Sequence, residues 1–125
     1  MWRILLEATF SARTPSPIQI RDDDPLAVFT GKMTVSSPTQ YDASAGITLP
    51  ARFSLKNLFS SVVIVLFDNI GITITGGTPP GVYFVYDKSN NIFRLYDFAD
   101  NAEIATTTHN VVLSDSGFIA YGNVY

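Results

Sequence analysis

Short segments in which apolar and polar residues alternate dominate this chain of 125 residues. At the N-terminus, every second residue of 2–10 is apolar, beginning with Trp2. A period of two places successive side chains on opposite faces of an extended chain, which is typical of a β-strand with one buried face. Clusters of Gly, Pro, Asn, Asp and Ser separate such segments about every 8–12 residues. The pattern predicts an all-β fold, an antiparallel β-sandwich of about eight short strands with jelly-roll-like or Greek-key connections.

The alternating segments also set the expected strand limits. The main strands are expected at residues 2–10, 26–35, 62–67, 71–75, 82–86, 92–98, 104–108, 110–113 and 118–124. Residues 36–50 are rich in Ser, Thr, Pro and Gly, which predicts a loop with a brief strand at 47–49. The Ser-Asp-Ser-Gly sequence at 114–117 predicts a tight turn. At most one short helical turn is expected, near 54–60, with Ser54 as its N-cap.

One strand differs from the alternating pattern. Residues 62–67, Val-Val-Ile-Val-Leu-Phe, are apolar at every position and therefore on both faces of an extended chain. Strands of this kind lie in the middle of a sheet that is covered on each side. We therefore expect residues 62–67 to form a central strand.

A β-hairpin is predicted over residues 82–98, where two aromatic-rich segments flank the polar sequence Asp-Lys-Ser-Asn-Asn. Asp favours the start of a type I turn, and Asn tolerates the left-handed backbone that closes such a loop. Both faces of both strands carry large apolar groups, so one face is expected in the core and the other against a neighbouring strand or subunit. The alternative is a sugar-binding platform built from Tyr83, Tyr86 or Tyr96. The candidate interface residues are Tyr83, Val85, Phe93, Leu95, Tyr96 and Trp2.

Length and composition favour a single domain over residues 1–125 with a covered surface. Charged residues make up 15% of the chain, against about 25% in an average globular protein. A chain so poor in charge is expected to have part of its surface covered by another protein. The Pro-rich segment near the N-terminus suggests that residues 1–25 form a strand or arm that contacts neighbouring proteins.

Several partner classes are disfavoured. The Lys and Arg residues are scattered singly and the net charge is −3, whereas nucleic-acid binding needs a cluster of basic groups. The apolar run 62–67 is far shorter than the roughly 20 residues that span a bilayer. Glu7 interrupts the N-terminal apolar stretch, so a secretory signal is not expected and the protein is expected to be soluble. The chain has no cysteine, which excludes disulfides and thiolate metal ligands.

No residue pattern supports catalysis, a metal or a cofactor. His109 is the single histidine, and no Gly-x-Ser-x-Gly sequence is present. The run Asp22-Asp23-Asp24 lacks the alternate spacing of a calcium loop. Asp97, Asp100 and Glu103 are spaced somewhat better for an ion, but we interpret them as loop caps. A non-enzymatic protein is therefore predicted.

From residue 41 to residue 122, the order of short motifs resembles a known family. These motifs are Tyr41-Asp42 with Gly46, the sequence SLKNL, the hairpin YDKSNNIFRLY, the segment AEIAT and the terminal FIAYG. In this order they are similar to small virion structural proteins of tailed bacteriophages, of the capsid decoration or head-stabilising type, with Ile104 in place of a family Leu. The resemblance implies a β-sandwich, oligomeric and without catalytic activity, seated on capsomers.

The combined expectation is a capsid decoration or cement protein. It would bind the major capsid protein and sister subunits on the outer surface of the virion, after synthesis in the host cytoplasm, and a trimer is favoured. Bridging neighbouring capsid subunits would stabilise the shell by linkage. The alternative is a tail or fibre component, or a lectin-like module that recognises surface glycan.

Overall fold

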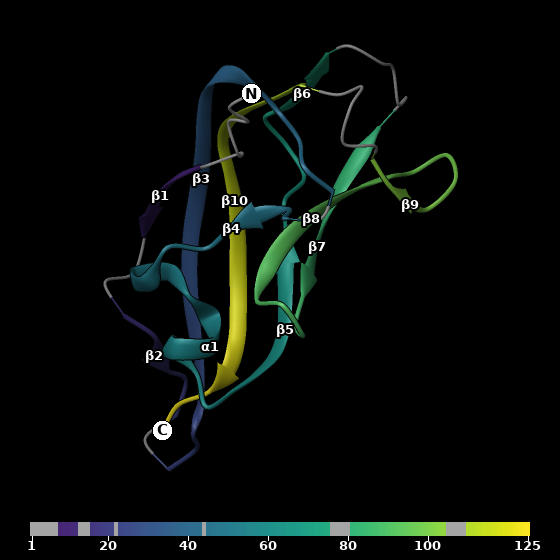
Figure 1. Cartoon of the computed structure of the whole chain (residues 1–125). Coiled ribbons are helices and arrows are strands. Elements are labelled where there is room, and N and C mark those ends of the chain that lie inside the picture. Colours follow the sequence, from purple (N-terminus) through teal and green to yellow (C-terminus); the bar gives the residue numbers. More distant parts are fainter. Residues whose placement is uncertain (1–7, 13–15, 22, 44, 76–80, 105–109) are drawn as a thin grey trace.

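The computed structural model describes residues 8–12, 16–21, 23–43, 45–75, 81–104 and 110–125 (Figure 1). Within these ranges ten strands form two antiparallel sheets, with two short helical segments beside them. The prediction of an all-β antiparallel sandwich is confirmed. The expected strand segments 2–7 and 105–108 lie outside the described residues, as do Trp2 and His109.

The larger sheet has six strands. Its path runs β1 (Thr9–Ala12), β3 (Leu26–Gln40), β10 (Asn110–Asn123) and β5 (Ser61–Phe67). Two further strands extend it, because β2 (Ile18–Gln19) pairs with β3 and β6 (Ile72–Thr75) pairs with β10. Strands β5 and β6 therefore follow one another along the same side of β10.

The smaller sheet has four strands and carries the hairpin. Its path runs β4 (Ile47–Thr48), β8 (Ile92–Asp97) and β7 (Val82–Asp87), and β9 (Ala102–Glu103) also pairs with β8. Figure 1 shows these strands lying over one face of the long β3–β10 pair. Strands β7 and β8 form a hairpin, in which Tyr83 lies opposite Tyr96 and Val85 lies opposite Arg94. The β-hairpin predicted over residues 82–98 is therefore confirmed.

Two strands are longer than the sequence predicted. The expected loop at 36–50 is wrong in its first part, because β3 continues through Gln40 and pairs there with Asn110. The expected turn at 114–117 is also wrong, because β10 runs through it without a break. Leu113 pairs with Val35 of β3, and the next paired residue, Ser116, pairs with Met33. The chain therefore advances three residues on β10 and two on β3, which leaves one extra residue of β10 in a bulge. Asp115 lies in this bulge with φ 51°, a left-handed conformation that occurs both in one class of β-bulge and in several turn types.

The core lies between the two sheets and is rich in aromatic rings. Phe93 packs at 4.9 Å from Phe67 and 5.2 Å from Phe118, measured between ring centroids. Phe93 and Leu95 are fully buried in this core. Their expected role as interface residues is therefore wrong, because the inner face of β8 packs against the larger sheet and leaves neither side chain available to a partner.

One end of the sandwich holds the helical residues. A 3₁₀ turn (Ala51–Phe53) leads into the short helix α1 (Leu55–Leu58), and both bury an apolar side chain, Phe53 and Leu55. The predicted helical turn near 54–60 is present as α1, whereas the 3₁₀ turn at 51–53 is a second helical segment beyond the one that was expected. Ser54 takes the N-cap position without a side-chain capping bond, because its Oγ accepts a hydrogen bond from Asn91 Nδ2 at 2.7 Å. No helix in the described part of the chain is long and apolar enough to cross a bilayer.

Candidate interaction surfaces

The outer face of the hairpin carries an aromatic cluster. The ring of Tyr83 lies 4.6 Å from that of Phe98 and 5.8 Å from that of Tyr96, between centroids. Phe98 is 60% exposed, whereas Tyr83 and Tyr96 are half-buried. The Tyr83 hydroxyl donates a hydrogen bond to Asn101 Oδ1 at 3.2 Å. This cluster is the nearest approach in the described chain to the expected aromatic platform.

Tyr86 does not belong to that platform. It is paired with the buried Phe93 across the hairpin and therefore shares its inward face, with the two rings 5.9 Å apart. Its hydroxyl donates to Asn91 Oδ1 at 2.6 Å. Burial, and then the nearby carboxylate of Asp87, raise the pKa of Tyr86. Of the three tyrosines considered for the aromatic platform, only Tyr83 and Tyr96 share the outer face of the hairpin. The third ring of the cluster is that of Phe98.

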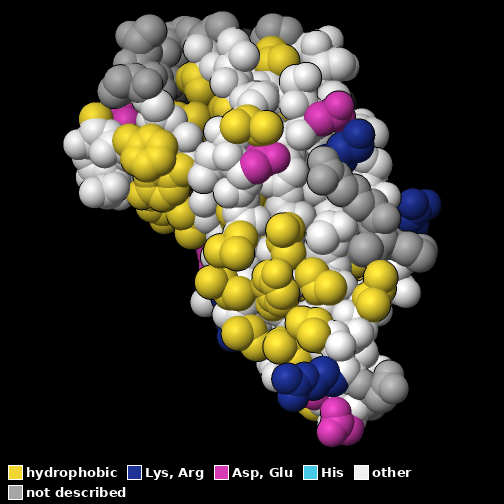
Figure 2. Space-filling model, turned by 180° about the vertical axis from the view of Figure 1, so that it is seen from behind, with side chains coloured by type: hydrophobic (Ala, Val, Ile, Leu, Met, Phe, Trp, Pro, Cys, Tyr) yellow, Lys and Arg dark blue, Asp and Glu magenta, His cyan; other side chains and the backbone are white. Residues whose placement is uncertain are grey.

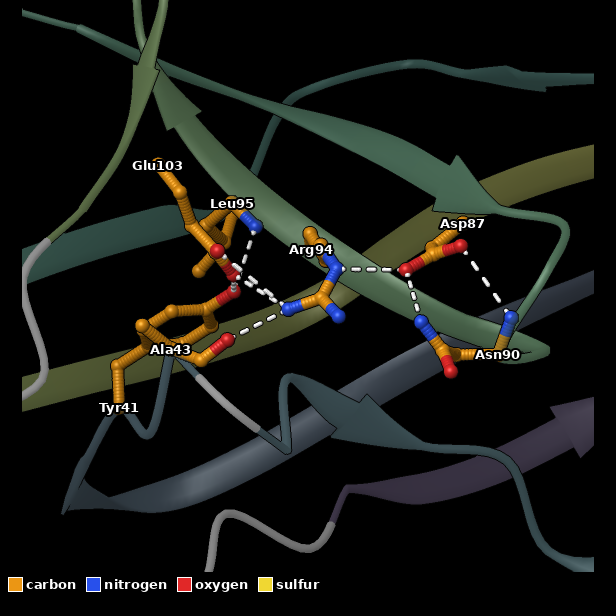
Figure 3. Close-up of polar contacts among 7 residues, drawn as sticks. All are labelled: Tyr41, Ala43, Asp87, Asn90, Arg94, Leu95 and Glu103. Carbon is orange, nitrogen blue, oxygen red and sulfur yellow. Dashed lines mark hydrogen bonds and ion pairs between the residues drawn. The ribbon is translucent and has the colours of Figure 1, made fainter.

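Beside the hairpin lies a polar network centred on Arg94 (Figure 3). Its Nε donates to Asp87 Oδ2 at 2.9 Å, and its Nη1 donates to Glu103 Oε2 at 3.0 Å and to the carbonyl oxygen of Ala43. The buried Tyr41 hydroxyl donates to the same Glu103 carboxylate and accepts from the backbone N–H of Leu95 at 3.1 Å. The network thus ties the chain after β3 to strands β8 and β9.

The polar groups of this network are paired with one another. Burial, and then the hydrogen bond to Glu103, raise the pKa of the Tyr41 hydroxyl, so the group stays neutral. Among the described residues, no buried side-chain nitrogen or oxygen lacks a hydrogen-bond partner. Buried polar groups that are hydrogen-bonded in this way stabilise a unique packing.

The role of Asp87 in this network leads to a pH-dependent prediction. Hydrogen bonds from Asn90, and then from Arg94, lower the pKa of Asp87 to about 2. Because the unfolded value is about 3.9, the ionised carboxylate stabilises the fold above that pH, and the contribution is lost as the pH falls toward the folded value. We expect Asp87→Asn to have a lower Tm than the wild type at pH 7 and nearly the same Tm at pH 2, measured by circular dichroism.

The matched control for Asp87 is Asp23→Asn, in an exposed loop. It is expected to leave the Tm unchanged at both pH values. An Asp87→Asn deficit of equal size at pH 7 and pH 2 would contradict the assignment, since a pH-independent loss does not come from the carboxylate charge.

The outer face of the larger sheet carries the main apolar surface. Cross-strand pairs share a face, and pairing joins four strands in one row, Ile18 to Val28, Val28 to Tyr121 and Tyr121 to Ile64. In the next row Ile119 lies opposite Leu66. We call these six residues the apolar sheet face, and Figure 2, which views the molecule from behind, shows apolar side chains gathered there. The exposed fractions are 52% for Ile18, 48% for Ile64, 49% for Leu66 and 37% for Ile119.

The apolar character is confined to one part of this face. Farther along the same strands, Lys32 Nζ lies 3.6 Å from Asp115 Oδ1, and the Thr34 hydroxyl donates to the same carboxylate at 3.1 Å. That part of the sheet has the polar outer surface expected of a two-layer sandwich. A contiguous apolar group on an outward sheet face instead marks an interaction site.

Strand β5 borders this surface, and its predicted central position is wrong. In the described part of the chain β5 pairs only with β10 and forms an edge of the sheet. Val63 sits at a register shift between Tyr121 and Gly122 and is 61% exposed. Apolar residues on both faces of 62–67 predict a strand with other parts of the protein packed on each face. In the part of the chain that the structure describes, only the inner face of β5 is packed against the core.

A groove separates β5 from the hairpin. It has a volume of about 400 Å³ and is lined by residues of β5 and β7, together with Lys88. At the end where β5 begins, a second hollow of about 220 Å³ is lined by Lys56, Lys88 and Val62 among others. The free side of β5 therefore opens onto a surface depression.

The carboxylates considered for ion binding cap loops instead. Asp24 Oδ1 accepts from Leu26 N at 2.9 Å, Asp97 Oδ1 from Ala99 N at 2.8 Å, and Asp100 Oδ1 from Ala102 N at 3.1 Å. Glu103 is held by Arg94. Within the described ranges, no group of three His, Cys, Asp or Glu side chains is placed to hold a metal ion. Asp22 and His109 lie outside those ranges.

Sequence reasoning found part of the interaction surface and missed the larger part. Tyr83, Val85 and Tyr96 do lie on the outer face of the hairpin, half-buried. The apolar sheet face was missed, because its residues come from four strands that are distant in sequence. The usable signal was the run 62–67, of which Ile64 and Leu66 reach that face.

In comparisons with known proteins, no family model, curated protein or solved structure matches this chain.

Proposed function

We propose that the protein is a non-enzymatic structural component of a bacteriophage particle, a capsid decoration or cement protein that binds the major capsid protein through the apolar sheet face. The observation that carries the proposal is the row of apolar side chains across β2, β3, β10 and β5 on an outward surface. The low content of charged residues and the resemblance to phage virion proteins support the same role.

The physical mechanism is burial of that face between capsid subunits. Fully burying a Leu or Ile side chain contributes about 1.5–3 kcal/mol. Ile18, Ile64 and Leu66 are each about half exposed, so each can contribute roughly 1 kcal/mol on docking. A protein that binds the assembled shell and not its separated subunits stabilises the shell by linkage.

Co-sedimentation with empty capsids of the source phage tests the proposal. We expect the wild-type protein to pellet with capsids at micromolar concentration, and Ile18→Lys to remain in the supernatant, because a lysine there puts an unpaired charge into the interface. The matched control is Phe98→Lys, an equally exposed apolar residue in the aromatic cluster of the hairpin, which is expected to pellet as the wild type does.

A glycan-binding role is the second candidate, and the exposed cluster of Phe98, Tyr83 and Tyr96 favours it. The same variants separate the two functions. Failure of the wild type to co-sediment, together with glycan-array binding that Phe98→Lys abolishes, would overturn the decoration role in favour of a lectin-like module.

A further inference from the structure

The edge strand β5 lacks the features that normally prevent edge-to-edge pairing. Edge strands present unpaired N–H and C=O groups, and proteins protect them with charged side chains, Pro or coverage by another segment. Ser61–Phe67 contains no charged residue and no Pro. Among the residues that the structure describes, its one protective feature is the register shift at Val63, while the rest of the strand opens onto the groove beside β7.

The faces of β5 determine how a second strand can pair with it. Leu66 and Ile64 are paired with Ile119 and Tyr121 and point outward, while Val65 is paired with the buried Ala120 and points inward. Strands that pair must keep outward residues opposite outward residues. Over Ile64, Val65 and Leu66, an antiparallel pair of two β5 strands meets this condition with a two-fold axis at Val65, where Ile64 of one copy lies opposite Leu66 of the other.

Charges at the two ends of β5 are complementary under the same symmetry. Asp68 directly follows the strand, and Lys56 and Lys88 line the hollow at Val62, near its beginning. Neither lysine is ion-paired with a carboxylate among the residues that the structure describes. A two-fold axis at Val65 places Asp68 of each copy opposite Val62 of the other and therefore beside these lysines.

We infer that the occupant of the β5 edge is a second copy of this chain, paired antiparallel through β5 about a two-fold axis at Val65. The contact is isologous, so both copies use the same residues and the assembly closes as a dimer. This goes beyond the proposed function and does not depend on capsid binding. The two-fold axis runs perpendicular to the sheet, so the apolar sheet faces of both copies lie side by side on one surface.

Oligomeric mass gives the first test. Sedimentation equilibrium of the full chain at micromolar concentration is expected to give twice the chain mass of 13.7 kDa. Val63→Lys is expected to weaken the dimer at least about tenfold, because it places a charge in the pairing edge. Ile18→Lys is the control, at a similarly exposed residue of β2 that lies toward the opposite edge of the sheet, and is expected to stay dimeric. A monomeric or trimeric wild type, or a dimer lost in Ile18→Lys and kept in Val63→Lys, would overturn the inference.

Cysteine cross-linking tests the register. The chain has no native cysteine, so the double variant Ile64→Cys/Leu66→Cys has a clean background. On mild oxidation we expect it to form a covalent dimer on a non-reducing gel, because directly opposed residues have Cβ atoms about 4.5–5.5 Å apart. Ile64→Cys alone is expected to cross-link poorly, since its counterpart in the other copy is Leu66. Equal cross-linking of the single and double variants would contradict the axis at Val65.

Fold controls separate failure of this inference from failure of the proposed function. Each variant is checked by its circular dichroism spectrum and Tm before its mass is measured. A wild type that pellets with capsids and is monomeric in solution removes the dimer and keeps the decoration role. A wild type that is dimeric in solution and does not pellet with capsids removes the decoration role and keeps the dimer.

Discussion

Replacing Phe93 by alanine is expected to lower the free energy of unfolding by about 3–5 kcal/mol, the range for removing a fully buried Phe. The ring is completely buried and contacts Phe67, Phe118, Tyr86 and Phe10 within the core. Its loss leaves a cavity between the two sheets that the surrounding rings cannot fill without moving both β8 and β10. Urea unfolding followed by circular dichroism measures the change.

The control for Phe93→Ala is Phe98→Ala, which removes an equally large ring from the exposed position directly after β8. It is expected to cost less than about 1 kcal/mol, as exposed substitutions do. The comparison also tests the corrected assignment of Phe93. An interface residue would show a normal unfolding free energy and a defect in association alone, and that outcome would contradict its place in the core.

Replacing Gly71 by alanine is expected to cost at least about 2 kcal/mol. Gly71 has φ +73°, and the left-handed conformation alone costs a residue with a Cβ roughly 1–2 kcal/mol. A Cβ there would lie 2.2 Å from the carbonyl oxygen of Ser114. The backbone cannot move away easily, because Gly71 O accepts a hydrogen bond from Ser114 N at 2.8 Å. Thermal and urea unfolding of Gly71→Ala measure the cost.

Gly81→Ala is the matched control for Gly71. Among the described residues, the Cβ there would meet the exposed Phe98 side chain alone, at 3.2 Å, and that ring can shift. We expect an unfolding free energy within about 0.5 kcal/mol of the wild type. If the two variants lose similar amounts of unfolding free energy, the close contact between Gly71 and Ser114 does not explain the cost of Gly71→Ala.

The hairpin was predictable because its information is local. The Asp87 carboxylate accepts hydrogen bonds from the backbone and side-chain nitrogens of Asn90, and Asn91 takes φ 56° to close the loop. All three residues stand within five positions of one another, and their turn preferences do not depend on the rest of the fold. The helical turn after Ser54 was predictable for a similar reason.

The continuity of β10 was not predictable in this way. Ser114 to Gly117 has the composition of a turn, and only long-range contacts select the bulge. Gly117 N donates to Asp68 Oδ2 at 3.1 Å, and the buried Ser116 hydroxyl donates to Ile70 O at 2.8 Å. Both partners belong to the connection between β5 and β6, almost fifty residues earlier in the chain. The turn composition alone does not predict these long-range contacts, which hold the segment within β10.

The residue pattern alone predicts the all-β class, the hairpin and an apolar strand at 62–67, because periodicity and turn chemistry act over a few residues. The edge position of β5, the burial of Phe93 and the outward direction of Ile64 follow instead from how the strands pair. A strand's alternation assigns residues to two faces without saying which face is covered. That depends on which strands become neighbours, and here Ile18, Val28, Tyr121 and Ile64 meet in one row only because four separate segments pair.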